Sequence, residues 1–523
     1  MYSGLLCELT LVWCLSRSVA LWGAFIRPGG LLDLEGSVSI EGLQVPDTVP
    51  SPIRARRTRF RRVFASRRVL LVAFAFSVMA DPVSSVAYAV EAALRALGGD
   101  LSLLLATMGL VIAIIALVIV NYRQLIKRYP KGGGASAAVG EAFGDGWSFI
   151  PIGALVVDFV LTIAVSVSAG ASAAIAYFPG LAPWRIEIAI GLLLVVATAT
   201  LFGHLGRIIF AGMTLTFIVL TALVLLYGLG VTPQAIGTIA DTPPHIPIVA
   251  VLLAFPVAMA LATGVEAPST AIAELGQLDD AGRRRFGRLT LWLTLGVVGT
   301  VTIGLAAELV HLRIGIPGPN TTQIAELARV VAPAPLFAAF QLATALLLLA
   351  AASSAFQAGP GMLKALARHA RADGRLVGIL PAVLARTNSR HTPIWGVATF
   401  ALLSVVIVII AGARDQSLVL FYAVAVFLSF LGGLLAMARF SFRDGRRASL
   451  LLNLVGAVVV LFTLIMNLSR GLPLISLAAA LVISTILNRI WVRSGRPEGV
   501  RSIQAASTTT STGAAKPPSA AAP

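Results

Sequence analysis

Residues 69–90 read VLLVAFAFSVMA, then Asp81-Pro82, then VSSVAYAV. This apolar stretch is long enough to cross a membrane, for which about 20 mostly apolar residues are needed. The proline near its middle removes one backbone hydrogen bond and clashes with the preceding turn of a helix. An acid at such depth is costly and marks a functional site by default. The stretch therefore predicts an interrupted membrane helix that carries a functional carboxylate, Asp81.

A second stretch has the same design. Residues 255–269 read FPVAMALATGVEAPS, and Glu266 lies between Gly264 and Pro268 near the middle of an apolar segment. Interrupted helices at matching places in two halves of a chain are the best sequence sign of an inverted-repeat transporter. With the twelve spans given below numbered in chain order, we expect spans 1–5 and 6–10 to form the two halves. Spans 1 and 6 are then the broken helices, and spans 11 and 12 are peripheral.

The composition also excludes an ordinary soluble protein. Apolar residues make up 58% of the 523 residues and charged residues only 12%, whereas soluble domains have about 45–50% and about 25%. In lipid each spanning segment must be a helix, because backbone polar groups cannot remain unpaired there. The expected fold is an all-α polytopic membrane protein with about twelve transmembrane helices, at 69–97, 101–121, 149–177, 188–203, 207–228, 246–273, 289–309, 336–360, 392–412, 417–437, 449–468 and 472–492.

The net charge of +17 is explained largely by topology. If the N-terminus is cytoplasmic, 32 of the 40 Lys and Arg residues lie on the inside and only six on the outside. This asymmetry predicts a multi-pass protein of the cell membrane with both termini in the cytoplasm. The arginine-rich run 54–68 could bind nucleic acid, but its place directly before span 1 favours an anchor on anionic lipid. We therefore expect the lipid bilayer, and no nucleic acid, as a partner.

The two ends of the chain differ from the middle. We expect residues 1–67 to be a cytoplasmic Arg-rich extension, 68–493 the transporter domain, and 494–523 a disordered cytoplasmic tail rich in Ala, Ser, Thr and Pro. Residues 3–26 could be a further span or a signal, although Glu8 and Arg17 interrupt them. The only cysteines, Cys7 and Cys14, lie in this extension and cannot build a metal site or a disulfide framework for the membrane domain.

Four stretches together resemble the amino acid–polyamine–organocation (APC) superfamily of transporters, and within it most of all the proton-coupled potassium importers. They are DPVSSVAYA at 81–89, YRQ at 122–124 followed by YPKGGG at 129–134, VVDFVLTIAVS at 156–166, and ATGVEA at 262–267. The sequence YAVAVF at 422–427 is a weaker fifth. The resemblance runs from about residue 67 to residue 468.

The resemblance implies a site for a small cation. In the potassium importers it is formed by residues that correspond here to Asp81, Tyr88, Ser166, Thr263, Glu266 and Tyr422. One departure is Phe159, where the family has a tyrosine; its ring offers only a face to a cation. A second is that those importers carry a cytosolic regulatory domain after the last span, where this chain has a short tail.

The charges of the broken spans separate the possible substrates. Amino-acid carriers of this superfamily bind the substrate carboxylate with bare N–H groups at a Gly-rich break in span 1. An acid at that break repels a carboxylate and attracts a cation. If Asp81 and Glu266 lie close together, one can carry a proton while the other holds the ion. Asp158 is a third proton-coupling candidate, and a structural role for it remains open.

The sequence thus predicts a secondary transporter, with proton-coupled uptake of potassium or another small cation as the leading hypothesis. The alternatives are an amino acid or amine permease on the same scaffold, and a receptor or scaffold that binds a ligand without transporting it. An enzyme is not expected, because no nucleophile–base pair or metal-binding motif is present. No cofactor is expected besides a driving ion, H⁺, and no metal beyond a monovalent cation at the substrate site. A homodimer is left open.

Overall fold

The computed structural model of the chain describes residues 67–202, 207–240, 245–272, 275, 278–367, 369–370 and 376–497. These residues all belong to one compact unit, Val63–Pro523. The predictions for the N-terminal extension, including Cys7 and Cys14, and for the tail beyond Pro497 lie outside the described residues.

The first five predicted spans all form helices. Their elements, in chain order, are α3 (Arg67–Val78), α4 (Ala80–Ser84) and α5 (Val86–Ala96) for span 1; η1 (Leu101–Leu103) and α6 (Leu104–Arg128) for span 2; the short α7 (Gly134–Phe143); η2 (Asp145–Ser148) and α8 (Phe149–Tyr177) for span 3; η3 (Pro179–Trp184) and α9 (Arg185–Phe202) for span 4; and α10 (Arg207–Gly228) for span 5. The η segments are 3₁₀ helices.

The remaining spans are also helical. Span 6 consists of α11 (Pro247–Ala258), η4 (Met259–Ala262) and α12 (Ala267–Ala271). Span 7 is α13 (Asp280–Leu312), and the short α14 (Gln323–Val331) lies between it and span 8, which is α15 (Ala334–Ala367). After the strand pair β1 (His369–Ala370) and β2 (Leu376–Val377) and the short η6 (Ala382–Ala385), spans 9 to 12 are α16 (Ile394–Ile410), α17 (Asp415–Arg443), α18 (Arg447–Leu468) and α19 (Pro473–Arg493).

The predicted number of spans is confirmed. Among the described residues, ten helical segments are long and apolar enough to cross a membrane. The interrupted span 1 and the 17-residue α16 complete the twelve. Several helices exceed their apolar stretch. For example, α13 begins at Asp280, well before residue 289, because the Asp279 side chain accepts a hydrogen bond from the Gly282 N–H (3.0 Å) and caps the charged first turn.

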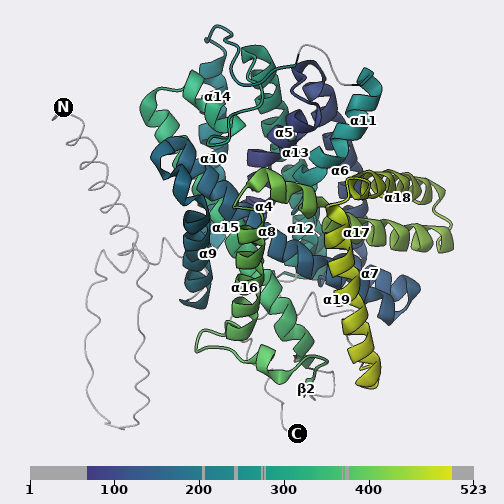
Figure 1. Cartoon of the computed structure of the whole chain (residues 1–523). Helices are drawn as coiled ribbons and strands as arrows, with labels where there is room; N and C mark the ends of the chain where they lie inside the picture. The colour runs from purple at the N-terminus through teal and green to yellow at the C-terminus, as the bar shows by residue number, and fades with distance from the viewer. Residues whose placement is uncertain are drawn as a thin grey trace, which may run out of the picture. The chain divides into compact units, whose positions relative to one another are not determined.

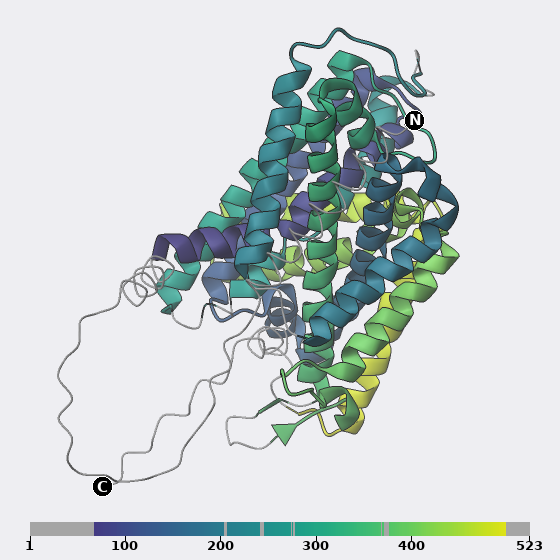
Figure 2. The ribbon, with the colours of Figure 1, turned by 90° about the vertical axis from the view of Figure 1, so that its left-hand side faces the viewer.

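Two short helices mark corresponding places in the two halves. In the first half α7 follows span 2, and in the second half α14 follows span 7. Because spans 2 and 7 run in opposite directions, these helices belong to opposite ends of the bundle, as an inverted repeat requires. Figure 1 shows α5, α11 and α14 near one end and β2 near the other, and Figure 2 shows long helices running between these ends. We call the end of the bundle with α14 the α14 end, and the opposite end, with β2, the α7 end.

The centre of the bundle is α8, which is buried along nearly its whole length. It packs against α15, α16, α17 and α19. Small residues permit this close packing, as expected for helices in lipid. At Gly153, for example, an added Cβ would lie 2.6 Å from the carbonyl oxygen of Ala480 on α19. Asp158, Thr162 and Ser166 follow one another at helical spacing on α8, so one buried face of this central helix is polar.

Span 11, predicted to be peripheral, is tied to the bundle by amide side chains. Asn453 on α18 accepts a hydrogen bond from Asn121 Nδ2 on α6 (3.0 Å) and donates one to Gln124 Oε1 (3.0 Å). At the other end of α18, Asn467 Nδ2 donates to the carbonyl oxygen of Pro256 in span 6 (3.0 Å). The helix is therefore fastened to both halves of the transporter.

Replacing Asn453 by Leu is expected to destabilise the protein, because it leaves the buried Asn121 amide without its partner. Interhelical hydrogen bonds in membranes contribute about 0.6 kcal/mol on average and at most about 1.7 kcal/mol. A double-mutant cycle with Asn121→Leu, read from unfolding in denaturing detergent, should give a coupling energy in this range. Additive effects of the two substitutions would show that the hydrogen bond contributes nothing.

Candidate functional site

Span 6 is fully interrupted at the predicted position. The 3₁₀ helix η4 ends at Ala262, Thr263 is extended (φ −66°, ψ 140°) and Gly264 has a left-handed φ of +77°. Helical structure resumes in α12 after Glu266, with Pro268 in its first turn. The Thr263 hydroxyl donates to the Ala260 carbonyl oxygen (2.7 Å) and so satisfies one of the acceptors that the broken helix leaves open. Glu266 therefore lies at the junction between two half-helices.

Span 1 is interrupted in a milder way than span 6. Its three pieces are separated by Met79 and Ser85, and both residues keep right-handed helical dihedral angles. The hydroxyl of Ser84 donates to the Asp81 carbonyl oxygen (2.7 Å), and that of Ser85 reaches the same oxygen at 3.4 Å. The chain is therefore not unwound around Asp81, because the backbone keeps a helical course there and the Val83 N–H donates to the Met79 carbonyl oxygen (2.9 Å).

The two breaks touch each other. A Cβ added to Gly264 would lie 2.8 Å from Asp81 Cγ, 2.8 Å from Asp81 Oδ2 and 2.8 Å from Pro82 Cδ. The backbone of span 6 therefore packs directly against the carboxylate of span 1. Only glycine combines this close approach with the left-handed φ at this position. The sequence places Asp81 and Gly264 at separate breaks, and the fold brings the two breaks into contact.

Three carboxylates from three spans gather at this contact. Asp81 and Glu266 are close enough to interact electrostatically, and Asp158 on α8 interacts with both. The backbone N–H groups of Gly264 and Glu266 lie near the Glu266 carboxylate. Even so, Asp81 Oδ1, Asp158 Oδ1 and Glu266 Oε2 are buried and have no hydrogen-bond partner in the described part of the chain. No Lys or Arg among those residues forms a salt bridge with any of the three.

The other residues of the predicted site are placed as follows. The Tyr88 hydroxyl donates to Ser85 Oγ (3.1 Å), and its backbone carbonyl accepts from Gln416 Nε2 on α17 (3.3 Å). Ser166 is buried on α8, two turns along from Asp158. Tyr422 belongs to α17, which packs against α5, α8 and η4, but its side chain lies outside the described residues. Phe159, the departure from the family, is partly buried against the core.

Tyr122 on α6 is a further member of this site. Its side chain is buried, its ring meets that of Phe430 edge to face (5.7 Å between centroids), and its hydroxyl interacts with Glu266 and Asp158. The side chain of Ser429 on α17 lies near that hydroxyl, although no hydrogen bond of normal geometry to it is found among the described residues. In the sequence, Tyr122 is distinguished only as part of a family motif, because a tyrosine near the end of a span ordinarily indicates the membrane interface.

A second polar layer lies between the carboxylates and the α14 end. Asp415 at the start of α17 accepts a hydrogen bond from Ser172 Oγ on α8 (2.8 Å), and Arg185 at the start of α9 donates to the same hydroxyl (2.8 Å). Glu91 on α5 pairs with Arg95 (2.8 Å). In addition, the Gln323 N–H of α14 donates to the Glu91 carboxylate (3.0 Å), and Gln416 joins Asp415 to the Tyr88 carbonyl.

This layer connects α5, α8, α9, α14 and α17, and it separates the three carboxylates from the α14 end. The sequence gives no signal for it, because acids and arginines near the ends of spans are ordinary. Chemically, the whole arrangement offers negative charge and hydroxyl oxygens at the junction of two broken helices. Such a site binds a small cation or a proton better than a carboxylate.

Comparisons with known proteins agree with this architecture. The family model described as amino acid permease matches residues 69–487. The potassium transporter KimA of Bacillus subtilis (strain 168) is 31% identical over 371 residues, which are 67% of this chain. The chain spans 58% of the length of that relative.

Solved structures give a more distant likeness. Two mutant forms of the manganese transporter of Eremococcus coleocola are 13% identical, with TM-scores of 0.44 and 0.45, and each comparison covers 82% of this chain and 95% of the other. The family match is decisive, because it extends from span 1 to span 12 and includes both broken helices. The protein therefore belongs to the amino acid permease family, within the APC superfamily of membrane transporters.

Proposed function

We propose that the protein is a secondary transporter that takes up potassium or another small monovalent cation together with protons. In this proposal the cation is held between Asp81 and Glu266, with Tyr88, Ser166, Thr263 and Tyr422 as further ligands. Asp81, Glu266 and Asp158 carry the coupled proton. Both termini are cytoplasmic, as the distribution of Lys and Arg predicts.

The observation that carries this proposal is the group of three unpaired carboxylates. Each has a buried oxygen without a hydrogen-bond partner among the described residues, and no basic side chain among them neutralises the group. Leaving three charged carboxylates side by side at membrane depth is very unfavourable. A bound cation and one or more protons remove that penalty, and exchange between them couples the two ions.

Two further points support a cation over an amino acid. An amino acid carries a carboxylate, which Asp81 would repel at the place where amino-acid carriers bind it. The relative KimA is named as a potassium transporter, and it is 31% identical to this chain. The second polar layer, between the carboxylates and the α14 end, supports alternating access, because its hydrogen bonds must break for an ion to pass on that side.

Cation binding can be measured directly on the purified protein. Potassium or rubidium at about one hundred times its dissociation constant should stabilise the folded state by about 2.7 kcal/mol. The measurement is the unfolding temperature in detergent, with choline as the inert cation and a panel of amino acids beside it. Stabilisation by an amino acid, with none by potassium or rubidium, would favour the amino acid permease instead.

Tyr122→Phe is expected to reduce uptake about fivefold to tenfold without unfolding the protein. The ring and its contact with Phe430 remain, but the hydroxyl near Glu266 and Asp158 is lost. In this proposal that hydroxyl donates to one of the two carboxylates during transport, and the loss of one such bond costs about 1–1.5 kcal/mol. Uptake is measured in proteoliposomes, with Tyr227→Phe as the control because Tyr227 is exposed. Equal uptake by both variants would remove Tyr122 from the site.

A further inference from the structure

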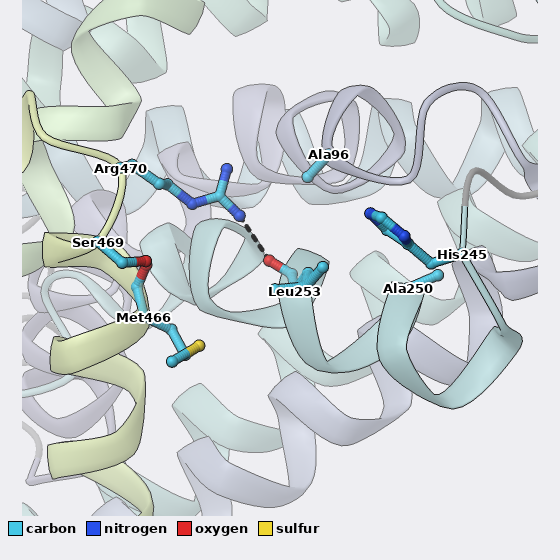
Figure 3. A pocket seen from close by; sticks show the side chains of 7 residues that line it. All are labelled: Ala96, His245, Ala250, Leu253, Met466, Ser469 and Arg470. Carbon is cyan, nitrogen blue, oxygen red and sulfur yellow. Dashed lines mark hydrogen bonds between the residues drawn. The ribbon is translucent and has the colours of Figure 1, made fainter.

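A cavity of about 260 Å³ opens at the α14 end, away from the carboxylates. Figure 3 shows the side chains that line it. Its walls come from the end of α5, the start of α11 and the end of α18. Seven residues line it, and they divide into a polar group and an apolar group: His245, Ser469 and Arg470, and Ala96, Ala250, Leu253 and Met466. Figure 3 shows the Arg470 guanidinium and the His245 ring on opposite sides of the opening.

The polar side of the cavity carries uncompensated positive charge. One guanidinium nitrogen of Arg470 donates to the Leu253 carbonyl oxygen (2.5 Å), which leaves most of its five N–H donors available. No Asp or Glu among the described residues forms a salt bridge with Arg470. The His245 ring adds a second nitrogen donor across the opening. Charge complementarity therefore favours an anion, and the planar guanidinium fork suits a phosphate group.

The position of the cavity shows what kind of phosphate fits. α18 ends at Leu468 and α11 begins at Pro247, so Arg470 and His245 stand just beyond the apolar helices, at the height of lipid headgroups. Below them, exposed apolar side chains continue along both helices, with Leu252 on α11 and Ile465 on α18 as examples. A ligand with a phosphate head and an acyl chain matches both parts.

We propose that this cavity binds an anionic phospholipid, with its phosphodiester on Arg470 and His245 and an acyl chain along Leu253 and Met466. On the cytoplasmic side of membranes, basic pockets between helices hold phosphate-bearing lipid headgroups, and the same charge complementarity applies at the α14 end, which the distribution of Lys and Arg predicts to be outside. Because the walls belong to spans 1, 6 and 11, the bound lipid ties the α14-end halves of both broken helices to α18. It stabilises the protein at this contact independently of the ion that the protein carries.

The test measures the unfolding temperature of the full chain in detergent during titration with phosphatidylglycerol, and in parallel with phosphatidylcholine and with inorganic phosphate. Phosphatidylglycerol should stabilise the wild type more than phosphatidylcholine does. Arg470→Gln should weaken this binding about fivefold, since one basic residue near a lipid surface is worth about 1 kcal/mol. The control is Arg313→Gln, because Arg313 is an exposed arginine at the same end of the bundle.

A second variant separates lipid binding from folding. Arg470 also donates a hydrogen bond to the Leu253 carbonyl oxygen, so its substitution can destabilise α11 even without a bound lipid. The His245 side chain does not make that hydrogen bond. His245→Gln should therefore lower lipid affinity while the unfolding temperature without lipid stays unchanged. Undiminished phosphatidylglycerol binding in both variants would overturn the proposal. Full competition by inorganic phosphate, with equal stabilisation, would identify a free anion and overturn the lipid assignment.

Discussion

Glu266→Gln is expected to lower cation uptake by at least about tenfold to a hundredfold, and Asp81→Asn to do the same. The amides keep the size of the side chains but remove the charge that holds the cation and the site that carries the proton. Contacts to charged groups are worth about 1.5–3 kcal/mol, which sets this range. Rubidium uptake into proteoliposomes measures it, with Glu187→Gln as the control because Glu187 is an exposed acid in the first turn of α9.

The same two substitutions should leave stability intact or raise it. Asp81, Asp158 and Glu266 repel one another in a buried place, so removing one charge relieves the other two. An unfolding temperature at or above that of the wild type, together with lost uptake, distinguishes an ion site from a structural pairing of acids. If both amide variants transport as the wild type does, the carboxylates do not form the ion site.

Gly264→Ala should abolish uptake and destabilise the protein strongly. The new methyl group would lie 2.8 Å from both Asp81 and Pro82, and the residue would have to keep a φ of +77°. A left-handed residue other than glycine costs about 1–2 kcal/mol before any clash is counted. To relieve the overlap, the two broken helices must move apart, and the carboxylates with them. Uptake and unfolding temperature are measured together.

Gly296→Ala provides the matched control for this substitution. It adds the same methyl group in the interior of α13, where no atom other than those of the adjacent residues and of the helix's own backbone lies within 4 Å of the new Cβ. Alanine is favoured over glycine in a helix by about 1 kcal/mol, so this variant should be as stable as the wild type or more so, and should transport normally. Similar behaviour of the two alanine variants would contradict the close contact between spans 1 and 6.

Much of the architecture could be predicted because membrane spans are recognisable in a sequence by their length and apolar composition. All twelve predicted segments are helical, and the break at residues 263–266 lies where Gly264 and Pro268 predict it. The break in span 1 is milder than expected because Met79 and Ser85, which separate its pieces, keep helical dihedral angles, and the Val83 N–H still donates to the Met79 carbonyl oxygen (2.9 Å). The short helices α7 and α14 were not predicted, since a few turns at a membrane surface leave no long apolar stretch.

The candidate site was predictable only in part. Asp81 and Glu266 stand out in the sequence because acids are rare inside apolar segments. Tyr122 does not stand out, since its position at Glu266 depends on the packing of α6 against the break of span 6. The hydrogen bonds of Asp415 and Glu91 depend on α8 and α14, far away in the sequence. Such contacts arise from the packing of the whole bundle, so no local pattern encodes them.

The most direct test of cation transport is rubidium flux into proteoliposomes that contain the purified full chain, with and without an acid-outside pH gradient. We expect rubidium uptake that the gradient drives and a protonophore abolishes, with no uptake from a panel of amino acids and amines. Uptake of an amino acid without rubidium flux would contradict the assignment and identify an amino acid permease. A rate of rubidium uptake that is the same with and without the pH gradient would contradict the coupling to protons.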